Sequence, residues 1–218
     1  MKVLFIAVHP DDETLGCGGT ILKHKQKGDS LFWLIISELQ SNNANYHKER
    51  RDIINSVSKT YKFNQVFDSG FSAKELHNVD FNEIISKISE VINDVKPDII
   101  YTPNRSDVHT DHQIVAKAVA SCTKTFRNPF IKRILMYECL SESETNFPLP
   151  ENAFIPNVYS DITPFIDQKI DIMKLYKTEI HCPPLPRSPE NIRALARFRG
   201  SIAGIDYAEA FMLLRDIF

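Results

Sequence analysis

A short, unbroken apolar segment from Lys2 to Val8 leads directly into His-Pro-Asp-Asp-Glu at positions 9–13. The segment is continuous and rich in β-branched side chains, which is typical of a strand buried on both faces of a parallel sheet. In open α/β sheets, ligands bind at the carboxyl ends of such strands. Ionisable side chains at that edge are costly unless a cation or a substrate engages them. The segment therefore indicates both a fold class and the place of a functional site.

Along the rest of the chain, short apolar segments alternate with helical patterns at the spacing of βαβ units. We expect further strands at residues 31–36, 65–68, 98–103 and 133–138. Helices are expected over residues 14–27, 46–61 and 81–93 and after His112. The pattern predicts an α/β fold, in which a Rossmann-like, mostly parallel β-sheet is flanked by helices with right-handed crossovers.

A second polar cluster follows the fourth expected strand. Asn-Arg-Ser-Asp-Val-His-Thr-Asp-His occupies positions 104–112, and an amphipathic helix follows it. His9 and Asp12 are three residues apart, as are His109 and His112, so each pair can face one point across about one turn. Two imidazoles and one carboxylate leave a tetrahedral Zn2+ with one free position, the usual arrangement of a catalytic site.

These side chains also have structural interpretations. His109 and Asp111 remain alternatives to His112 as metal ligands, and Asp11 and Asp111 are suitable caps for the helices that begin near them. Glu13 is expected to act in ion pairing or at the start of a helix. A lone histidine would favour a purely structural interpretation. Two matching clusters, each after a buried strand, favour a shared site instead.

The composition narrows the class of protein. The chain has 218 residues, of which 43% are hydrophobic, and this fits one globular domain with a substantial core. The formal net charge of -2 gives no reason to expect nucleic acid or an anionic membrane as a partner. No apolar run approaches ~18 residues, so no membrane insertion is expected and the predicted location is cytoplasmic.

The character of the sequence changes after Leu140, where two polar or proline-rich stretches flank an amphipathic segment at residues 162–178. We expect residues 1–140 to form the Rossmann-like core. Residues 141–218 are expected to be loops and helices that close over the pocket, within one domain spanning residues 1–218. The four cysteines are far apart and are expected to be reduced thiols. Nothing in the chain indicates an oligomeric state.

Both polar clusters closely resemble the two signatures of the LmbE-like (PIG-L) N-deacetylases. The resemblance is carried by His-Pro-Asp-Asp-Glu at 9–13 with Leu-Gly-Cys-Gly-Gly at 15–19, and by Asp-Val-His-Thr-Asp-His at 107–112. Tyr-Ala-Glu-Ala-Phe at 207–211 is also similar to that family. Its members are zinc-dependent enzymes of the N-acetylglucosaminyl deacetylase type. They remove acetyl groups from N-acetylamino sugars and related glycosides.

The resemblance implies a role for each side chain. Asp11 would take a proton from zinc-activated water as that water attacks the acetyl carbon. His109, preferably protonated, would stabilise the oxyanion, while Asp111 orients His109 and stabilises its charge. Fe2+ can substitute for Zn2+ at such ligands. The metal ligands implied by the resemblance are His9, Asp12 and His112.

The chain departs from the family pattern around the expected substrate pocket. Thr110 stands where the family often has proline, and Ser-Glu-Leu-Gln at 37–40 replaces a Thr/Asp/Gly cluster. Phe-Ser-Ala-Lys at 71–74 stands in place of a Phe-Pro-Asp-like turn. Asp107 matches the family pattern, but the resemblance assigns it no role. The resemblance therefore implies the reaction and not the particular sugar.

A group of arginines near the C-terminus allows two interpretations. Either they form a solvated helix face, or one or two of them bind an anionic group such as the phosphate of a sugar nucleotide. Because Arg187 lies in a proline-stiffened loop and Arg193 follows on an expected helix, we expect these two to contact an anionic N-acetylamino sugar. The group comprises Arg187, Arg193, Arg197 and Arg199.

Three other functions compete with deacetylation of a sugar. The same groups could serve a metal-dependent esterase or amidase acting on another small acyl substrate. A non-catalytic metal-binding protein would have no need for Asp11 and His109. A phospho-receiver module would use the acidic pair for Mg2+, but Asp68 and Lys132 fit its remaining positions poorly.

Overall fold

A computed structural model describes residues 1–218 and is built on one seven-stranded sheet in the order β3-β2-β1-β4-β5-β7-β6. The first five strands run parallel, whereas β7 is antiparallel to β5 and β6 is antiparallel to β7. The fold is therefore α/β with a mostly parallel sheet, as predicted. The strands are β1 (Lys2–Ala7), β2 (Ser30–Glu38), β3 (Gln65–Ser72), β4 (Ile99–Pro103), β5 (Arg133–Tyr137), β6 (Val158–Asp161) and β7 (Ala208–Asp216).

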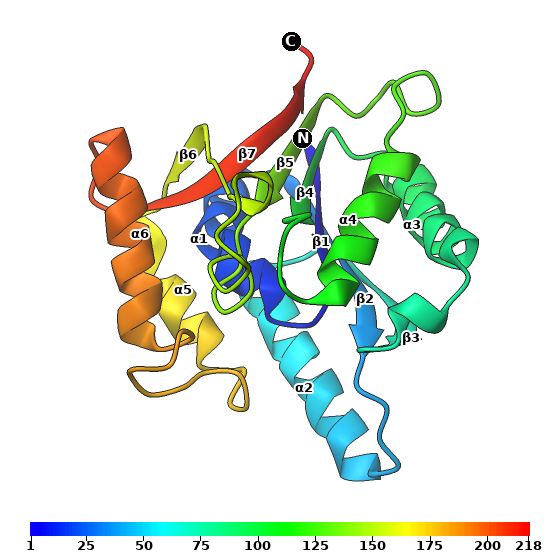
Figure 1. Cartoon of the computed structure of the whole chain (residues 1–218), viewed down its shortest axis with the longest axis horizontal. Helices are drawn as coiled ribbons and strands as arrows, with labels where there is room; N and C mark the ends of the chain where they lie inside the picture. The colour runs from blue at the N-terminus through cyan, green and yellow to red at the C-terminus, as the bar shows by residue number, and fades with distance from the viewer.

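Six helices cover the sheet unequally (Figure 1). Helices α3 and α4 pack on one face, over a cluster of buried apolar residues from β1, β2, β4 and β5. The remaining four helices share the larger apolar cluster on the opposite face. The helices are α1 (Asp12–Gln26), α2 (Ala44–Tyr61), α3 (Phe81–Val95), α4 (Thr110–Cys122), α5 (Ile166–Met173) and α6 (Pro189–Ala203).

The periodicity of the sequence located most of these elements to within a few residues. It missed β6 and β7, which extend the sheet beyond β5. The sequence of β7, Ala-Glu-Ala-Phe-Met-Leu-Leu-Arg-Asp, has little β-branched character, and its strand conformation comes from pairing with β5 on one side and β6 on the other. Part of the expected C-terminal appendage is thus continuous with the sheet.

Helix α1 lies unusually close to its neighbours because glycines face them. A Cβ at Gly16 would collide with the ring of Tyr137, and one at Gly19 would collide with Ile162. The carboxylate of Glu209 accepts hydrogen bonds from the backbone N–H groups of Gly19 and Thr20, at 2.8 and 2.7 Å. These contacts hold α1, whose first turn carries part of the first polar cluster, against its neighbours.

The four cysteines are free thiols, as expected. None of the helices combines the length and the apolar character needed to cross a membrane.

Candidate metal centre and active site

The two polar clusters meet at the carboxyl edge of the sheet, where β1 and β4 end side by side. They border a cavity of about 440 Å³ that opens between α2, the end of β2 and the segment that follows α5. His9, Asp11 and His109 line this cavity, together with Tyr176 and Arg187 from the C-terminal part of the chain. The cavity volume lies within the range of small-molecule binding sites.

Three predicted ligands form a compact donor set beside the cavity. Ligand atoms of His9, Asp12 and His112 all lie within 4.8 Å of one another. Asp12 Oδ2 is 3.4 Å from His112 Nε2 and 3.9 Å from His9 Nδ1. Asp12 and His112 are buried, and no Lys or Arg side chain forms an ion pair with Asp12. Two imidazoles and one carboxylate without a fixed cation suit a divalent transition metal.

Asp107, to which the sequence assigned no role, binds and orients His112. Its Oδ2 is 2.8 Å from His112 Nδ1, and its Oδ1 accepts a hydrogen bond of 2.5 Å from the Ser143 hydroxyl. A carboxylate bound to the far nitrogen of a ligating histidine sets the tautomer and the ring orientation. Here it leaves Nε2 of His112 directed toward Asp12. Burial opposes the charged form of His112, but Asp12 and Asp107 outweigh it and raise its pKa to about 9.

Asp12 is held as a carboxylate by its surroundings. Burial alone would raise its pKa, yet the charges of His112 and His9 and a backbone hydrogen bond keep the pKa below its ordinary value. The backbone N–H groups of Val8 and His9 donate to Asp12 Oδ2 at 2.9 and 2.8 Å. These bonds fix the carboxylate at the point where β1 turns into α1.

A second combination of ligands, His9 with His109 and Asp111, is also close enough to hold an ion. However, the backbone N–H of Asp111 donates to His109 Nδ1 at 3.1 Å, so that nitrogen is already engaged. The two combinations share His9. A single ion held by His9, Asp12 and His112 leaves His109 free to face the cavity. Of the alternatives left open by spacing, we therefore favour His112 as the ligand.

The structure does not show the expected contact between the Asp111 carboxylate and the His109 ring. The Asp111 carboxylate accepts a 2.6 Å hydrogen bond from the Lys74 backbone N–H, and its Oδ2 lies 3.9 Å from His9 Nε2. No side-chain hydrogen bond joins it to His109. His109, rather than Asp111, caps α4 with its side chain, because its Nδ1 is the acceptor that the first turn needs.

The surroundings of His109 also disfavour its protonated form. Burial and the neighbouring charges of His9 and His112 lower its pKa to about 4, and the nearby Asp111 does not compensate. In the neutral ring, an engaged Nδ1 acceptor places the proton on Nε2. The lowered pKa and this tautomer favour a neutral His109 with Nε2–H as its donor, against the expectation of a charged ring.

Asp11 adopts a rare backbone conformation for a residue other than glycine, with φ of 144° and ψ of -30°. Such a conformation costs of order 1–3 kcal/mol and persists only where the surroundings enforce it. Its side chain makes no capping bond to α1, so the capping interpretation is wrong. Burial and the charge of Asp12 raise the pKa of Asp11 well above its usual value, while Arg187 opposes the shift. A carboxylate of raised basicity that borders the cavity suits a general base.

Glu13 holds this backbone in place. Its carboxylate accepts hydrogen bonds from the Asp11 N–H at 3.1 Å, the Thr14 hydroxyl at 2.5 Å and the Tyr176 hydroxyl at 2.7 Å. The residue is completely buried, and burial raises its pKa to about 7 against these hydrogen bonds. Glu13 thus has a structural role, as expected, but it acts on Asp11 as well as on the helix start.

Arg187 reaches the cavity but is not free to bind an anion. Its Nη1 donates to Asp11 Oδ2 at 2.7 Å and to Glu179 Oε2 at 3.0 Å, and its Nη2 donates to Glu142 Oε1 at 3.2 Å. Nε donates to the Ser141 hydroxyl at 2.9 Å. The predicted phosphate contact is therefore wrong for Arg187, whose charge is used to neutralise three carboxylates.

The other arginines of the group face away from the cavity. Arg193 pairs with Asp167 at 2.5 Å and does not line the site, so its predicted role in substrate binding is also wrong. Arg197 pairs with Asp206, and Arg199 pairs with Glu138. These three form the solvated or locally paired helix face that was the simpler interpretation.

Several residues of the site carried no recognisable signal in the sequence. Tyr176, Glu142 and Glu179 come from segments without a motif, and only the chain fold brings them to the cavity. Cys139 places its Sγ 3.5 Å from Asp12 Oδ1, although no pattern distinguished it from the other cysteines. The Arg187 loop was the one informative signal, because its prolines marked a segment that could reach the pocket.

The receiver-module alternative fails on geometry. Lys132 precedes β5, at the edge of the sheet opposite the cavity, and its amine donates to the Pro129 carbonyl at 2.9 Å. Asp68 is paired with Arg50. Neither residue lies with the acidic pair after β1.

Comparison with known proteins finds one matching family and several relatives. The model of one protein family, PIG-L, described as GlcNAc-PI de-N-acetylase, matches residues 4–123, which include both polar clusters. A curated relative, the uncharacterized deacetylase YaiS of Escherichia coli (strain K12), is 26% identical over 185 residues, covering 81% of this chain and 90% of its own. The diacetylchitobiose deacetylase of Thermococcus kodakarensis is 22% identical, over 100% of this chain and 84% of its own.

Solved structures share the fold across the whole chain. The conserved protein TT1542 from Thermus thermophilus has a TM-score of 0.78 at 23% identity, and the match covers 99% of this chain and 96% of that protein. The N,N'-diacetylchitobiose deacetylase from Pyrococcus horikoshii, solved with an inhibitor, has a TM-score of 0.77 at 19% identity, and the match covers 98% of this chain and 84% of that enzyme.

Proposed function

This chain belongs to the PIG-L family of de-N-acetylases, and on that premise we propose that it is a metal-dependent hydrolase that removes the acetyl group from an N-acetylamino sugar. One observation carries the proposal. Asp11 borders the cavity immediately beside the donor set of His9, Asp12 and His112 without belonging to it. A base next to a metal-type site, with a hydrogen-bond donor across the same cavity, is what water-dependent hydrolysis of an amide needs.

The donor set fits a divalent ion on its chemistry. Asp12 is a carboxylate held by backbone hydrogen bonds, and His112 is oriented by Asp107. His9, Asp12 and His112 would hold the ion, with Zn2+ as the proposed metal and Fe2+ as a substitute. When bound, such an ion polarises the amide carbonyl and lowers the pKa of water to about 7 in favourable sites.

The remaining steps belong to the chain's own residues. Asp11 accepts a proton as water attacks the acetyl carbon, and its raised pKa makes the proton transfer favourable. The same carboxyl group then gives a proton to the nitrogen as the carbon–nitrogen bond breaks, so that a neutral amine leaves and acetate remains. Arg187 and the Glu13 hydrogen bond hold Asp11 in position through both transfers.

His109 completes the reaction site as a neutral donor. Its Nδ1 accepts from the Asp111 N–H, which leaves Nε2–H to donate to the oxygen of the acetyl group as negative charge develops there. Because its pKa is lowered to about 4, His109 is a weaker candidate than Asp11 for the acid that protonates the amine. We assign that step to Asp11 alone.

The cavity favours a neutral sugar over the anionic one that the arginines suggested. Five carboxylates line it against three basic side chains, and two of those, Arg50 and Arg187, are already paired with carboxylates. The outer wall carries an aromatic and two apolar side chains, suited to the face of a sugar ring or an attached group. They are Leu39, Tyr46 and Ile53.

An acetate-release screen tests this function directly. Zinc-loaded protein is given free N-acetylglucosamine, chitobiose-type disaccharides, nucleotide-linked N-acetyl sugars, and O-acetyl esters of similar size. We expect release from neutral N-acetylamino sugars or their glycosides. Preferential cleavage of the esters would support the esterase alternative, and no acetate from any substrate would leave a non-catalytic metal-binding protein.

His109→Ala should lower kcat by about 10²–10³-fold with little change in KM, because its hydrogen bond strengthens only as the oxyanion forms. His109→Gln should recover part of the loss, since a neutral amide N–H can donate to the same oxygen. Metal content should stay stoichiometric in both variants. If the glutamine variant is as inactive as the alanine variant, a charged histidine is required and the neutral-donor assignment fails.

Arg187→Met should lower kcat for neutral and nucleotide-linked substrates alike, by about 10²-fold, because misplacing a catalytic group by about 1 Å costs that much. Arg193→Met is the matched control and should have no effect, since Arg193 pairs with Asp167 outside the cavity. Steady-state kinetics at two salt concentrations checks this. A selective rise in KM for the nucleotide-linked sugar would restore Arg187 as an anion-binding residue.

A further inference from the structure

The two histidines of the proposed metal site are not held equally. The His112 ring is fixed at both nitrogens, since Nε2 lies 3.4 Å from Asp12 Oδ2 and Nδ1 lies 2.8 Å from Asp107 Oδ2. The backbone N–H of His9 donates to Asp12, but no hydrogen bond reaches the His9 ring, and its side chain is 24% exposed. A histidine ligand almost always has a partner on its second nitrogen, which sets the tautomer and the ring orientation.

Asp111 faces the second nitrogen of His9. His9 Nδ1 lies 3.9 Å from Asp12 Oδ2, and His9 Nε2 lies 3.9 Å from Asp111 Oδ2. Each nitrogen of His9 thus faces a different carboxylate, as the nitrogens of His112 face Asp12 and Asp107. The arrangement around Asp12 is therefore duplicated, because each histidine turns one nitrogen to Asp12 and the other to a carboxylate of the second polar cluster.

The Asp111 carboxylate has few hydrogen-bond partners. It is completely buried, and no Lys or Arg side chain forms an ion pair with it. Its Oδ2 accepts a hydrogen bond of 2.6 Å from the Lys74 backbone N–H, whereas its Oδ1 has no hydrogen-bond partner. A buried carboxylate with so few hydrogen bonds is costly, because burial removes the water that would otherwise bind it. An N–H donated by the His9 ring would reduce that cost.

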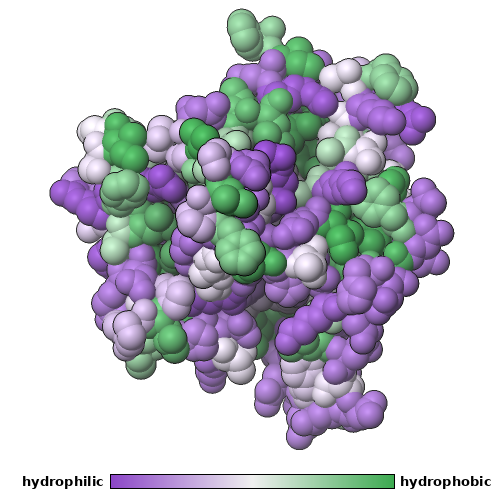
Figure 2. Space-filling model, in the orientation of Figure 1, coloured by the Kyte–Doolittle hydropathy of each residue, from purple (hydrophilic) through white to green (hydrophobic).

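Helix α4 directs Asp111 into the protein. Asp111 and His112 lie in its first turn and are buried, whereas Gln113 and Lys117 are exposed. Figure 2 views α4 from outside and shows a mixture of hydrophilic and hydrophobic residues on the surface there. The polar side chains that belong to the site are therefore on the inner side of the helix, next to the end of β1 that leads into His9.

The same carboxylate does not orient His109. The Nδ1 atom of His109 accepts a hydrogen bond from the Asp111 backbone N–H at 3.1 Å, a contact that does not involve the Asp111 side chain. A substitution at position 111 that keeps the backbone conformation should therefore preserve this contact and remove only the group that faces His9. The roles of the backbone and of the side chain can thus be separated by experiment.

We propose that Asp111 is a positioning residue for the metal ligand His9, as Asp107 is for His112. This inference rests on the metal site proposed above. His9 then carries its proton on Nε2 and offers Nδ1 to the ion, while His112 carries its proton on Nδ1 and offers Nε2. The present gap of 3.9 Å between His9 and Asp111 exceeds a hydrogen bond by about 1 Å. Rotation of the His9 ring closes it, because no other hydrogen bond holds that ring.

Zinc affinity of the full chain, measured by competition with a chelator, tests this role. We expect Asp111→Ala to weaken zinc binding by about 10–100-fold, the usual effect of losing such a partner. Asp111→Asn should lie between Asp111→Ala and wild type, because a neutral amide oxygen accepts a hydrogen bond more weakly than a carboxylate. Acetate release by both variants should be reduced at limiting zinc and should recover as the zinc concentration is raised.

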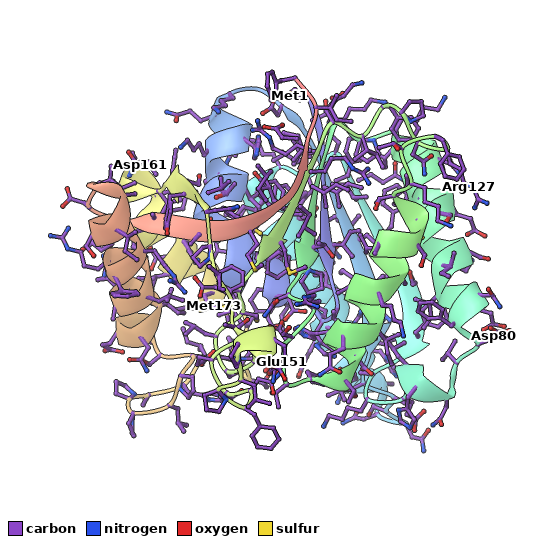
Figure 3. The ribbon with its side chains drawn as sticks, turned by 45° about the horizontal axis from the view of Figure 1, so that its top comes forward. Met1, Asp80, Arg127, Glu151, Asp161 and Met173 are labelled. Carbon is purple, nitrogen blue, oxygen red and sulfur yellow. The ribbon has the colours of Figure 1, made fainter.

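Asp80→Ala is the matched control. Asp80 is also an acidic residue at the start of a helix, where its side chain accepts a 2.9 Å hydrogen bond from the Asn82 N–H and caps α3, but it is exposed and does not line the cavity. Figure 3 labels Asp80 apart from Glu151, whose carbonyl accepts a hydrogen bond from Arg105 in the segment between β4 and α4. Zinc affinity of the control should equal that of wild type.

The tautomers provide a second readout, on wild-type protein. Long-range 1H–15N correlation spectra of the zinc-loaded chain show which ring nitrogen of each histidine carries the proton. We expect Nε2–H in His9 and Nδ1–H in His112. A proton on Nδ1 of His9 would overturn the proposal, because Nε2 would then be the ligand and could not donate to Asp111. This measurement decides the question even if a variant at position 111 fails to fold.

The remaining outcomes are distinct. Unchanged zinc affinity in Asp111→Ala, or a loss of activity that no zinc concentration restores, would overturn the positioning role. Two zinc ions bound per chain, one of them lost in Asp111→Ala, would make Asp111 a ligand and would also overturn it. Absence of zinc binding by wild-type protein would refute the proposed metal site itself, so that failure of the proposed function is distinguished from failure of this inference.

Discussion

Asp11→Asn is expected to retain its metal and lose most of its deacetylase activity, by about 10²–10⁴-fold in kcat, the usual contribution of general-base assistance. The carboxamide keeps the shape of the side chain and can still accept the Arg187 hydrogen bond, but it cannot take a proton from water. The structure strengthens this expectation, since burial and Asp12 raise the pKa of Asp11 and the Glu13 hydrogen bond fixes its strained backbone.

Metal analysis and single-turnover acetate release distinguish the roles of Asp11. Loss of metal in Asp11→Asn would make the residue a ligand. Turnover within a few-fold of wild type would remove it from the mechanism. Glu13→Gln is an informative companion, because it should lower activity through Asp11 while leaving metal content unchanged.

His112→Ala should abolish stoichiometric metal binding and, with it, turnover above the level of metal-free protein. The variant removes one of three ligands and also leaves Asp12 and Asp107 buried without the histidine that bridges them. Elemental analysis after dialysis and activity with excess Zn2+ measure both effects. A variant that binds metal as tightly as wild type would assign the ion to His9, His109 and Asp111 instead.

Asp107→Asn tests a residue that orients a metal ligand without being a ligand itself. Because Asp107 orients His112 without reaching the ion itself, its substitution should weaken metal affinity by about 10–100-fold and not abolish binding. Activity should then recover at high zinc concentration. Full activity at limiting zinc would show that His112 is oriented without the Asp107 carboxylate.

The membership of the family and the class of fold could be predicted from the sequence, because both depend on local patterns. The strand from Lys2 ends in a motif whose residues are close along the chain, and the alternation of apolar and helical segments determines a parallel sheet. Parallel strands bring their carboxyl ends to one edge, so the sequence predicts that His9 and His112 lie at the same edge of the sheet.

The roles assigned to Arg187, Arg193 and Asp111 could not be predicted correctly in the same way. Each role depends on which atoms of distant residues lie next to the side chain in the folded protein. Arg187 has the charge to bind phosphate, but the fold places Asp11, Glu142 and Glu179 against it. Sequence spacing describes which side chains share a face of one element, whereas these carboxylates come from three separate segments.

What the sequence alone determined, then, is the chemistry of two motifs and the edge of the sheet where they meet, because short-range patterning and parallel topology are encoded locally. The tertiary structure decided the tautomer of His109, the neutralisation of Arg187 and the pairing of β7 into the sheet. Those outcomes depend on burial and on contacts between residues distant along the chain. Burial changes the cost of a charge, and a distant contact decides which nitrogen carries a proton.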